Sequence, residues 1–498
     1  MECSEMAQWH LKPSDLKKYP HFDPLISART AESYSTDKIR VARHAFYPLM
    51  RYDQRWTRFA ERGALGRIKE RPIRYAARLD SCIFSYYRHV LSERYEAELV
   101  RLGLDRSVLA YRRIPTDDGR GGKCNIHFAR DAILKIRELG DCCVIGLDIS
   151  GFFESLDHAR LKDLWCRVLE VGKLPTDHFR VYKAITEYAE VEKVKVYERL
   201  GHFGEKQAGW DGKPTTGYLT PFRKIPKHLC GGKEFREKIA GRGGSTSIIE
   251  TNYKPYGIPQ GAPISDLLAN LYLLDFDNTV GMWIREVGGA YYRYSDDILI
   301  AVPGDESVGR DLRQRTCGLV REFGPRLVIK PEKSSLFVFR RCGAEQTFQL
   351  LDGTRGKNGL EYLGFRYDGK RVYLRDATIS NLRRKVAHAA RREASSCARR
   401  YPDKDVLKLK SLFNYERLIK RFGRVEDFDG KERNYRNWTF WTYATRASEV
   451  FGGLGRTILR QLRNHRKSIR WRAEKELERA VARRDRLKGH QSGLARFG

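Results

Sequence analysis

The sequence of 498 residues has no long apolar run and no paired-cysteine pattern. A membrane-spanning helix needs about 18 consecutive apolar residues, and no stretch of the chain approaches that length. The ten cysteines form no C-x-x-C pair and only Cys142 and Cys143 are adjacent, which argues against a structural zinc site or a disulfide framework. The N-terminal MECSEMAQWHLKPSD lacks the apolar core of a secretory signal. These absences predict a protein without a membrane segment that works in the reducing cytoplasm.

Acidic residues are scarce beside basic ones: 63 Asp and Glu stand against 95 Lys and Arg, giving a formal net charge of +32. Solubility alone requires far less charge, so the excess favours a polyanionic partner, nucleic acid above all. After residue 450 the balance is 14 Lys and Arg to 4 Asp and Glu. There Arg456, Arg460, Arg463 and Lys467 recur near helical spacing. They are candidate phosphate-backbone contacts, with a solvated helix face as the alternative.

Apolar periodicity predicts helices on both sides of a β-rich centre. The expected helices cover residues 78–102, 129–139, 157–170 and 265–277, and the chain from Thr378 onward. The apolar run CCVIGLDI predicts a buried strand over residues 142–149. Two β-rich runs around a polar turn predict a hairpin over residues 290–302. Residues 201–250 are rich in Gly, Lys and Pro and are expected to form a surface insertion.

Three aspartates fall where carboxylates are costly. Asp148 ends the expected buried strand, and Asp296 and Asp297 occupy the tip of the expected hairpin. Carboxylates held close together repel each other unless a positive charge compensates them. Mg²⁺ prefers carboxylate oxygen, water and phosphate as ligands, so a magnesium site is one explanation and ordinary surface turns are the other.

Seven short motifs occur along the chain in a fixed order: Arg71-Pro72-Ile73, Ala110-Tyr111-Arg112, Asp148–Phe153, Gly257–Ser265 (GIPQGAPIS), Tyr294-Ser295-Asp296-Asp297, Glu332-Lys333 and Tyr362–Phe365. Together they resemble the motifs of reverse transcriptases, over about residues 70–370. The segments Ala42–Pro48, Lys123–Ile126 and Gly257–Asn270 most resemble the bacterial unknown-group enzymes, many of which act in anti-phage defence. Retron signatures and a C-terminal Cys/His endonuclease cluster are not found in the sequence.

The resemblance implies an α+β right-hand polymerase. Fingers and an N-terminal extension would occupy residues 1–140. A palm with an antiparallel sheet plus helices would occupy 141–375, with the insertion at about 201–250. A basic, helical thumb would occupy 376–498.

The resemblance also implies a role for each motif residue. Asp148, Asp296 and Asp297, with the carbonyl of Ile149, would hold two Mg²⁺ ions, which Mn²⁺ can replace. Residues expected at the nucleotide are Lys69, Arg71, Phe153, Gln260 and Lys333. Arg112, Lys123, Leu363 and Gly364 are expected to contact nucleic acid. The four candidate phosphate contacts named above, Arg456, Arg460, Arg463 and Lys467, are expected to do the same.

Several of these residues have a second interpretation. Phe153 would exclude the 2′-hydroxyl of a ribonucleotide, but it can also be a core aromatic, since Phe152 is adjacent and only one ring can face the sugar. Lys69, Arg71 and Lys333 can be solvated surface side chains, and Gln260 a loop amide. Lys333 would otherwise protonate the departing pyrophosphate.

The expected function is RNA-directed DNA synthesis from dNTPs, with a dedicated non-coding RNA as template and DNA as product, in phage defence. Template-independent terminal transfer and a catalytically silent RNA-binding scaffold are the alternatives. An RNA-dependent RNA polymerase is a lesser one, because Phe153 and Ser295 depart from its usual pattern. Priming by nucleic acid or by a protein hydroxyl is open, as is assembly into a homo-oligomer.

Overall fold

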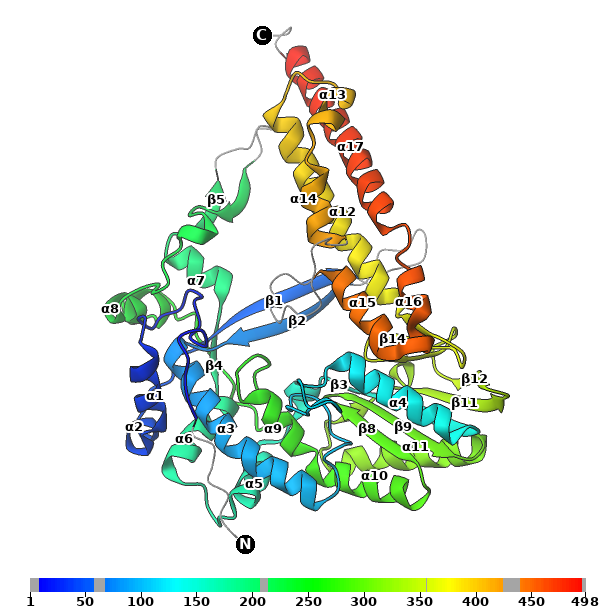
Figure 1. The fold of residues 1–498 in the computed structure, drawn as a ribbon. Helices are drawn as coiled ribbons and strands as arrows, with labels where there is room; N and C mark the ends of the chain where they lie inside the picture. The colour runs from blue at the N-terminus through cyan, green and yellow to red at the C-terminus, as the bar shows by residue number, and fades with distance from the viewer. Residues whose placement is uncertain (1–8, 58–67, 207–213, 355, 424–438, 495–498) are drawn as a thin grey trace.

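A six-stranded antiparallel sheet, named the central sheet below, lies in the lower right of Figure 1. The structure is a computed structural model, and it describes residues 9–57, 68–206, 214–354, 356–423 and 439–494. The strands follow the spatial order β12 (Glu345–Asp352), β11 (Ser335–Cys342), β3 (Cys142–Ser150), β9 (Asp297–Pro303) and β8 (Ala290–Tyr294), with β10 (Val328–Ile329) paired to the end of β3. The strand predicted at residues 142–149 and the hairpin predicted at 290–302 are both confirmed.

Both faces of the central sheet are covered, which is why β3 reads as a continuous apolar run. Cys142 and Val144 belong to a core that includes α4 (Asn125–Leu139). Ile145 and Leu147, with the opposite parity, belong to a second core. The helices of that second core are α9 (Ser265–Tyr272), α10 (Leu274–Glu286), α11 (Glu306–Glu322) and α5 (His158–Leu169). In Figure 1, α4 lies on one side of the sheet and α10 and α11 on the other.

A second sheet forms from segments of the N-terminal half. Its strands follow the order β2 (Ile68–Tyr75), β1 (Leu49–Thr57), β4 (Ala189–Glu192) and β7 (Glu250–Thr251). The sequence predicts mostly helical structure within residues 1–140 and no specific strand there, so the hairpin of β1 and β2 was not predicted. The helices that accompany it are α1 (Ala28–Thr36), α2 (Lys38–Ala42), α3 (Arg78–Arg101) and α6 (Thr176–Thr186).

The segment expected as an insertion contains a small core of its own. Its described elements include the hairpin β5 (Phe203–Lys206) and β6 (Thr215–Tyr218) and the short helix α8 (Gly232–Glu234), and α7 (Lys193–Arg199) directly precedes them. Ile225, Leu229 and Ile239 are buried there, together with Phe22 and Met50 from the N-terminal region. The described part of the segment therefore packs onto the N-terminal part of the chain, and its assignment as an insertion stays a prediction.

The C-terminal region is helical, as expected. A three-stranded sheet, β13 (Leu360–Tyr362), β14 (Phe365–Tyr367) and β15 (Val372–Leu374), leads into it. The helices are α12 (Asp376–Arg400), α13 (Val406–Leu412), α14 (Tyr415–Phe422), α15 (Phe440–Phe451), α16 (Arg456–Arg460) and α17 (His465–Leu494). Figure 1 shows α12 and α17 running side by side away from the central sheet, and they contact each other along their lengths.

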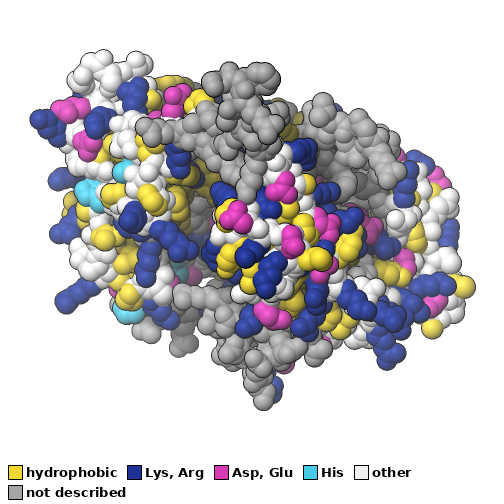
Figure 2. Space-filling model, turned by 90° about the horizontal axis from the view of Figure 1, so that it is seen from above, with side chains coloured by type: hydrophobic (Ala, Val, Ile, Leu, Met, Phe, Trp, Pro, Cys, Tyr) yellow, Lys and Arg dark blue, Asp and Glu magenta, His cyan; other side chains and the backbone are white. Residues whose placement is uncertain are grey.

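These layers confirm the predicted α+β fold class, with helices around sheets whose strands pair antiparallel except for the parallel pair β1 and β4. The division at residues 140 and 375 stays a prediction. Among the described helices, none combines the length and the apolar character that crossing a bilayer demands. Figure 2 shows the molecule from above, looking onto the end of the helical region. On the described residues of that face, Lys and Arg side chains are widely spread and are more prominent than those of Asp and Glu.

Candidate active site

The strand register brings two of the predicted aspartates together. Asp148 on β3 is the direct antiparallel partner of Asp297 on β9. Directly opposed residues have Cα atoms about 4.5–5.5 Å apart and side chains on the same face of the sheet. The backbone N–H of Ile149 donates to the carbonyl of Asp296 at 3.0 Å, which ties the end of β3 to the tip of the hairpin. The candidate catalytic trio therefore converges on one corner of the sheet.

The hairpin that carries Asp296 and Asp297 turns through an unusual backbone conformation. Tyr294 pairs with Asp297, which leaves Ser295 and Asp296 as the two loop residues. Ser295 has φ of 60°, in the left-handed region that glycine normally occupies. A residue with a Cβ in that region costs about 1–3 kcal/mol, so surrounding contacts must hold it there. One such contact is the hydroxyl of Tyr111, which donates to Oγ of Ser295 at 3.2 Å.

Electrostatics at the corner reflect crowded negative charge. Burial, and then the nearby carboxylate of Asp148, raise the pKa of Asp296 above the ordinary value for aspartate. Lys333 and Arg71 act in the opposite direction on the same carboxyl group. Burial and the neighbouring carboxylate thus both disfavour the charged form of Asp296, and a bound divalent cation would favour it.

Lys333 lies directly against the site. Its ammonium forms an ion pair with Asp148, and the two side chains are 19% and 20% exposed. The short helical turn Pro331–Lys333 that carries it follows β10, the strand paired to the end of β3. Lys333 is therefore close enough to act on a group bound by Asp148.

The other predicted nucleotide contacts differ in how well they are placed. Arg71 lies exposed on β2. Burial raises the pKa of both Asp296 and Tyr111, and the charge of Arg71 opposes that rise, which places Arg71 near the hairpin tip. Lys69 lies on the same strand, but its side chain falls outside the described residues. Both stay predictions as phosphate ligands.

Phe152 and Phe153 have different environments. Phe152 is 3% exposed and belongs to the core, whereas Phe153 is half-buried at the edge of that core. The carbonyl of Phe153 accepts from the N–H of Ile258, so this ring lies beside the loop that contains Gln260. Of the two rings, Phe153 is the one free to contact a ligand.

The Gln260 loop packs closely on the second sheet. The carbonyl of Gln260 accepts from the backbone N–H of Arg74 on β2 at 2.9 Å. Gly261 follows with φ of 117°, and a Cβ there would collide with the carbonyl oxygen of Arg74. Glycine is required at this position, and the half-buried Gln260 is held next to the strand that carries Arg71.

A cavity of about 70 Å³ connects the aspartates to the β13–β14 hairpin. Its lining includes Asp148, Asp297 and Lys333 from one side and Glu361 and Leu363 from the other. Leu363 and Gly364 form the turn of that hairpin, both with positive φ. The predicted primer-contacting turn is thus adjacent to the aspartates, and its role in binding stays a prediction.

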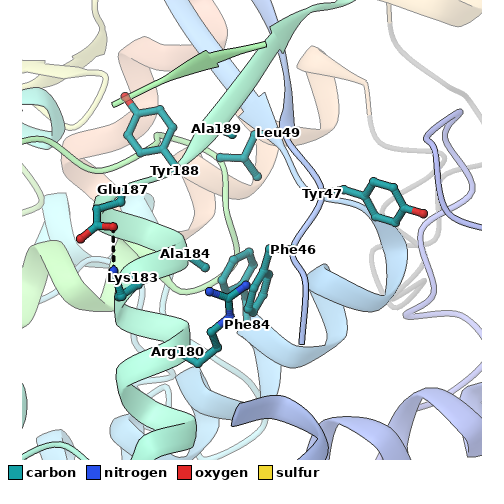
Figure 3. A pocket seen from close by; sticks show the side chains of 10 residues that line it. All are labelled: Phe46, Tyr47, Leu49, Phe84, Arg180, Lys183, Ala184, Glu187, Tyr188 and Ala189. Carbon is teal, nitrogen blue, oxygen red and sulfur yellow. Dashed lines mark ion pairs between the residues drawn. The ribbon is translucent and has the colours of Figure 1, made fainter. Parts of the chain in front are cut away.

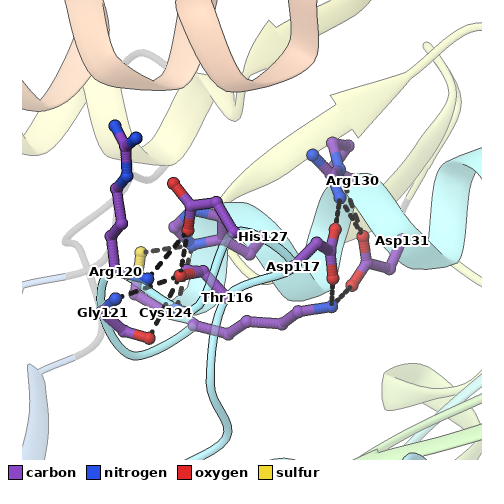
Figure 4. Close-up of polar contacts among 10 residues, drawn as sticks. Thr116, Asp117, Arg120, Gly121, Cys124, His127, Arg130 and Asp131 are labelled. Atoms are coloured by element: carbon purple, nitrogen blue, oxygen red, sulfur yellow. Dashed lines mark hydrogen bonds and ion pairs between the residues drawn. The ribbon is translucent and has the colours of Figure 1, made fainter.

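Arg112 and Lys123 are engaged within the protein. The Arg112 guanidinium forms an ion pair with Glu96 at 2.5 Å and donates to the carbonyl of Asp105 at 2.6 Å. Lys123 forms ion pairs with Asp117 at 2.9 Å and Asp131 at 2.8 Å (Figure 4). The geometry gives both residues a structural role, and nucleic-acid contact by either stays a prediction.

The four basic residues predicted as phosphate-backbone contacts after position 450 are exposed. Arg456 and Arg460 lie on α16, Lys467 lies on α17, and Arg463 lies between these helices. Sequence reasoning missed residues that the fold brings to the site: Tyr111, which contacts the turn, and Glu361 and Arg375, which line the cavity. The motif Ala110-Tyr111-Arg112 predicts a contact by Arg112, whereas in the structure Tyr111 contacts the turn.

A larger cavity of about 160 Å³ lies elsewhere, between α3, α6 and β4 (Figure 3). Stacked Phe46 and Phe84 and the side chains of Arg180 and Tyr188 line it. It shares no lining residue with the aspartate cavity.

The acidic corner suits magnesium better than a metal that needs an all-protein cage. Within the described residues no group of three or more His, Cys, Asp or Glu side chains comes close enough to hold one ion. Mg²⁺ is usually bound by one or two carboxylates, with water and substrate phosphate completing its shell. The opposed pair Asp148 and Asp297, with Asp296 beside them, supplies that kind of donor set.

Comparison with known proteins finds structural likeness only. No protein-family model and no curated protein matches the sequence. A C-terminally truncated apo telomerase from Candida tropicalis is 9% identical, with a TM-score of 0.33, over 71% of this chain and 62% of that one. The apo telomerase from Candida tropicalis is 10% identical, with a TM-score of 0.34, over 88% and 64%. The Candida albicans telomerase in complex with a TWJ fragment of telomeric RNA is 11% identical, with a TM-score of 0.34, over 89% and 59%. This chain thus spans about three fifths of the structures it matches.

Proposed function

We propose that this chain is an RNA-directed DNA polymerase, which joins dNTPs to a primer by two-metal-ion nucleotidyl transfer. The observation that carries the proposal is the register pairing of Asp148 with Asp297, with Asp296 beside them, at a partly exposed corner of the central sheet. The ordered motifs around the same corner give it the character of a reverse transcriptase.

The residues at the corner divide the work of the reaction. Bound divalent cations would supply the charge that promotes attack of the primer 3′-hydroxyl on the α-phosphate and stabilises the leaving pyrophosphate. Asp148 and Asp297 orient that centre, and Lys333, in contact with Asp148, donates a proton to the departing pyrophosphate. The exposed Arg71 binds the triphosphate through its planar guanidinium.

Two further residues select and orient the nucleotide. The half-buried ring of Phe153 blocks a 2′-hydroxyl, so dNTPs are used in preference to rNTPs. Gln260, beside the strand that carries Arg71, hydrogen-bonds near the nucleotide. The turn of Leu363 and Gly364 supports the primer end across the cavity.

The biological setting we propose follows from the resemblance to defence-associated bacterial enzymes. The template would be a dedicated non-coding RNA and the product a DNA that acts against phage, in the cytoplasm. The net charge of +32 is consistent with a nucleic-acid partner. Assembly into a homo-oligomer belongs to the same proposal.

Primer extension with the purified full chain tests the reaction. Oligo(dT) on poly(rA), and a DNA primer on a mixed-sequence RNA, are incubated with dNTPs, and in a parallel reaction with rNTPs, in the presence of Mg²⁺ or Mn²⁺. Products whose sequence follows each template are expected. Products that ignore the template would identify a terminal transferase, and products made only from rNTPs an RNA polymerase.

Sequencing the nucleic acids that copurify with the protein tests the partner. A single RNA species with complementary DNA is expected, and any covalently attached primer would be recovered with it. RNA bound without a DNA product, in cells where the protein is active, would support a scaffold instead.

A further inference from the structure

A buried guanidinium lies directly beneath the turn that carries the candidate catalytic aspartates. Arg293, on β8, donates from Nε and Nη2 to the two carboxylate oxygens of Asp277 at 2.6 and 2.5 Å. Both side chains are 0% exposed. A buried ion pair adds little stability over apolar residues of similar volume, so its presence here needs another explanation.

The remaining nitrogen of the guanidinium supplies that explanation. Nη1 of Arg293 donates to the carbonyl oxygen of Ser295 at 3.1 Å and to Oδ1 of Asn270 at the same distance. Ser295 is the residue with the left-handed φ, and Asp296 follows it directly. The guanidinium therefore fixes the orientation of the peptide group between Ser295 and Asp296, in the middle of the catalytic turn.

The partners of Arg293 are themselves fixed. Asn270 on α9 also donates from Nδ2 to the carbonyl of Ala110 at 2.8 Å, and Tyr111, the next residue, donates to Oγ of Ser295. Ser295 is thus held through its carbonyl and through its hydroxyl by groups anchored on different elements. Such a network rigidifies a turn only while every member is satisfied.

We propose that Arg293 is a positioning residue for the metal site: its hold on the Ser295 carbonyl keeps the turn in the left-handed conformation that places Asp296 beside the ladder pair Asp148 and Asp297. The catalytic consequence rests on the proposed function, whereas the effect on the turn does not. A lysine can neutralise Asp277, but it lacks the planar fork that reaches Asp277, Asn270 and Ser295 together.

The substitution Arg293→Lys tests the proposal, because it keeps the charge opposite Asp277. The variant is expected to keep its circular dichroism spectrum but to bind Mn²⁺, measured by electron paramagnetic resonance, about 10–100-fold more weakly. In primer extension, kcat should fall more than the KM for dNTP changes. Adding Ser295→Gly should restore much of the Mn²⁺ affinity, since glycine adopts the left-handed conformation without help.

A matched control is Arg78→Lys. Arg78 is equally buried, pairs with Asp23 at 2.8 Å and donates to the carbonyl of Tyr19 at 2.9 Å, but it belongs to a different part of the fold. This variant should lose thermal stability and leave Mn²⁺ affinity unchanged. Equal losses of Mn²⁺ affinity in both variants, or no rescue by Ser295→Gly, would overturn the positioning role.

A second variant covers the case in which Arg293→Lys does not fold. Arg293→Met combined with Asp277→Leu removes the ion pair without leaving a buried charge, so the fold should be retained. Weakened Mn²⁺ binding is again expected, and unchanged binding would overturn the proposal. If the wild-type protein copies no template but these variants still lose Mn²⁺, the proposed function fails and the positioning role stands.

Discussion

Asp148 and Asp297 stand opposite each other on neighbouring antiparallel strands, although the chain between them forms several helices and two strands of a second sheet. Since the pairing is set by the backbone ladder, neither carboxylate can be moved without shifting a whole strand. The paired strands therefore hold the carboxylates of Asp148 and Asp297 in fixed positions at this corner of the sheet.

Neutralising any one of the three aspartates should abolish synthesis. Asp148→Asn, Asp296→Asn and Asp297→Asn each remove a metal-binding charge while keeping the side-chain volume. We expect primer extension to fall by at least about 10³-fold, as for the loss of a central electrostatic group, with RNA affinity unchanged in filter binding. Asp352→Asn, on the outer strand of the same sheet, is the matched control and should retain activity.

Phe153→Ala should relax the choice of sugar. Without the ring, a 2′-hydroxyl meets no obstruction, so rNTP incorporation relative to dNTP should rise in single-nucleotide addition assays. Phe152→Ala is the control: its ring is in the core, so the variant should lose about 3–5 kcal/mol of stability and keep the selectivity of the wild type. Unchanged selectivity in Phe153→Ala would remove its assignment as the gate.

Lys333→Met should separate metal binding from chemistry. The ammonium pairs with Asp148 and so competes with a cation for that carboxylate. Mn²⁺ should bind the variant more tightly, while the rate of nucleotide addition falls about 10²-fold or more through loss of the proton donor. Equal or weaker Mn²⁺ binding would contradict the competition, and an unchanged rate would contradict the role as acid.

The exposed basic residues near the C-terminal helices should set the salt dependence of RNA binding. Replacing Arg456, Arg460, Arg463 and Lys467 by Gln should weaken binding, and each lost phosphate contact should lower the slope of log K against log salt by about 0.7–0.9. The control replaces the four arginines of α11, Arg310, Arg313, Arg315 and Arg321. That helix covers the face of the sheet opposite α4, so the slope should not change.

Acid should destabilise the N-terminal region through His21. Burial, and then the neighbouring Arg78, lower the pKa of His21 from 6.5 to about 3. The folded protein therefore keeps His21 neutral, and the stability this provides is complete above pH 6.5 and is lost as the pH falls toward 3. The free energy of unfolding, measured by urea titration from pH 7 to pH 4.5, should decline below pH 6.5 by about 1.4 kcal/mol per pH unit. His21→Asn should flatten this decline, and an equally steep decline in the variant would contradict the assignment.

Local patterns in the sequence predicted the central strands because those strands are buried on both faces. The apolar run before Asp148 and the two runs around the Ser-Asp-Asp turn have little alternative in a folded chain. The β1–β2 hairpin was not predictable in the same way. Its strands carry many charged residues, and Pro72 lies within β2, which the fold tolerates because β2 is an edge strand.

The positive charge of a residue in the sequence does not show whether its side chain is available to bind a ligand in the fold. Arg112 and Lys123 look like nucleic-acid contacts in the sequence, but the fold gives them carboxylate partners, Glu96 for one and Asp117 and Asp131 for the other. Conversely, the hold of Arg293 on the Ser295 carbonyl depends on a buried network that spans several elements. Such partners are set by tertiary structure and leave no periodic signal.

The small core beneath residues 201–250 bears on how the enzyme can be shortened. His21 exchanges backbone hydrogen bonds with Lys227 and Leu229, and Phe22 and Met50 are covered by apolar side chains of that segment. Excising the segment would strip the covering from the N-terminal residues and from β1, the strand that pairs with β2 and so supports Arg71. A trimmed chain would therefore lose the support of Arg71, the proposed triphosphate ligand, before it lost its acidic corner.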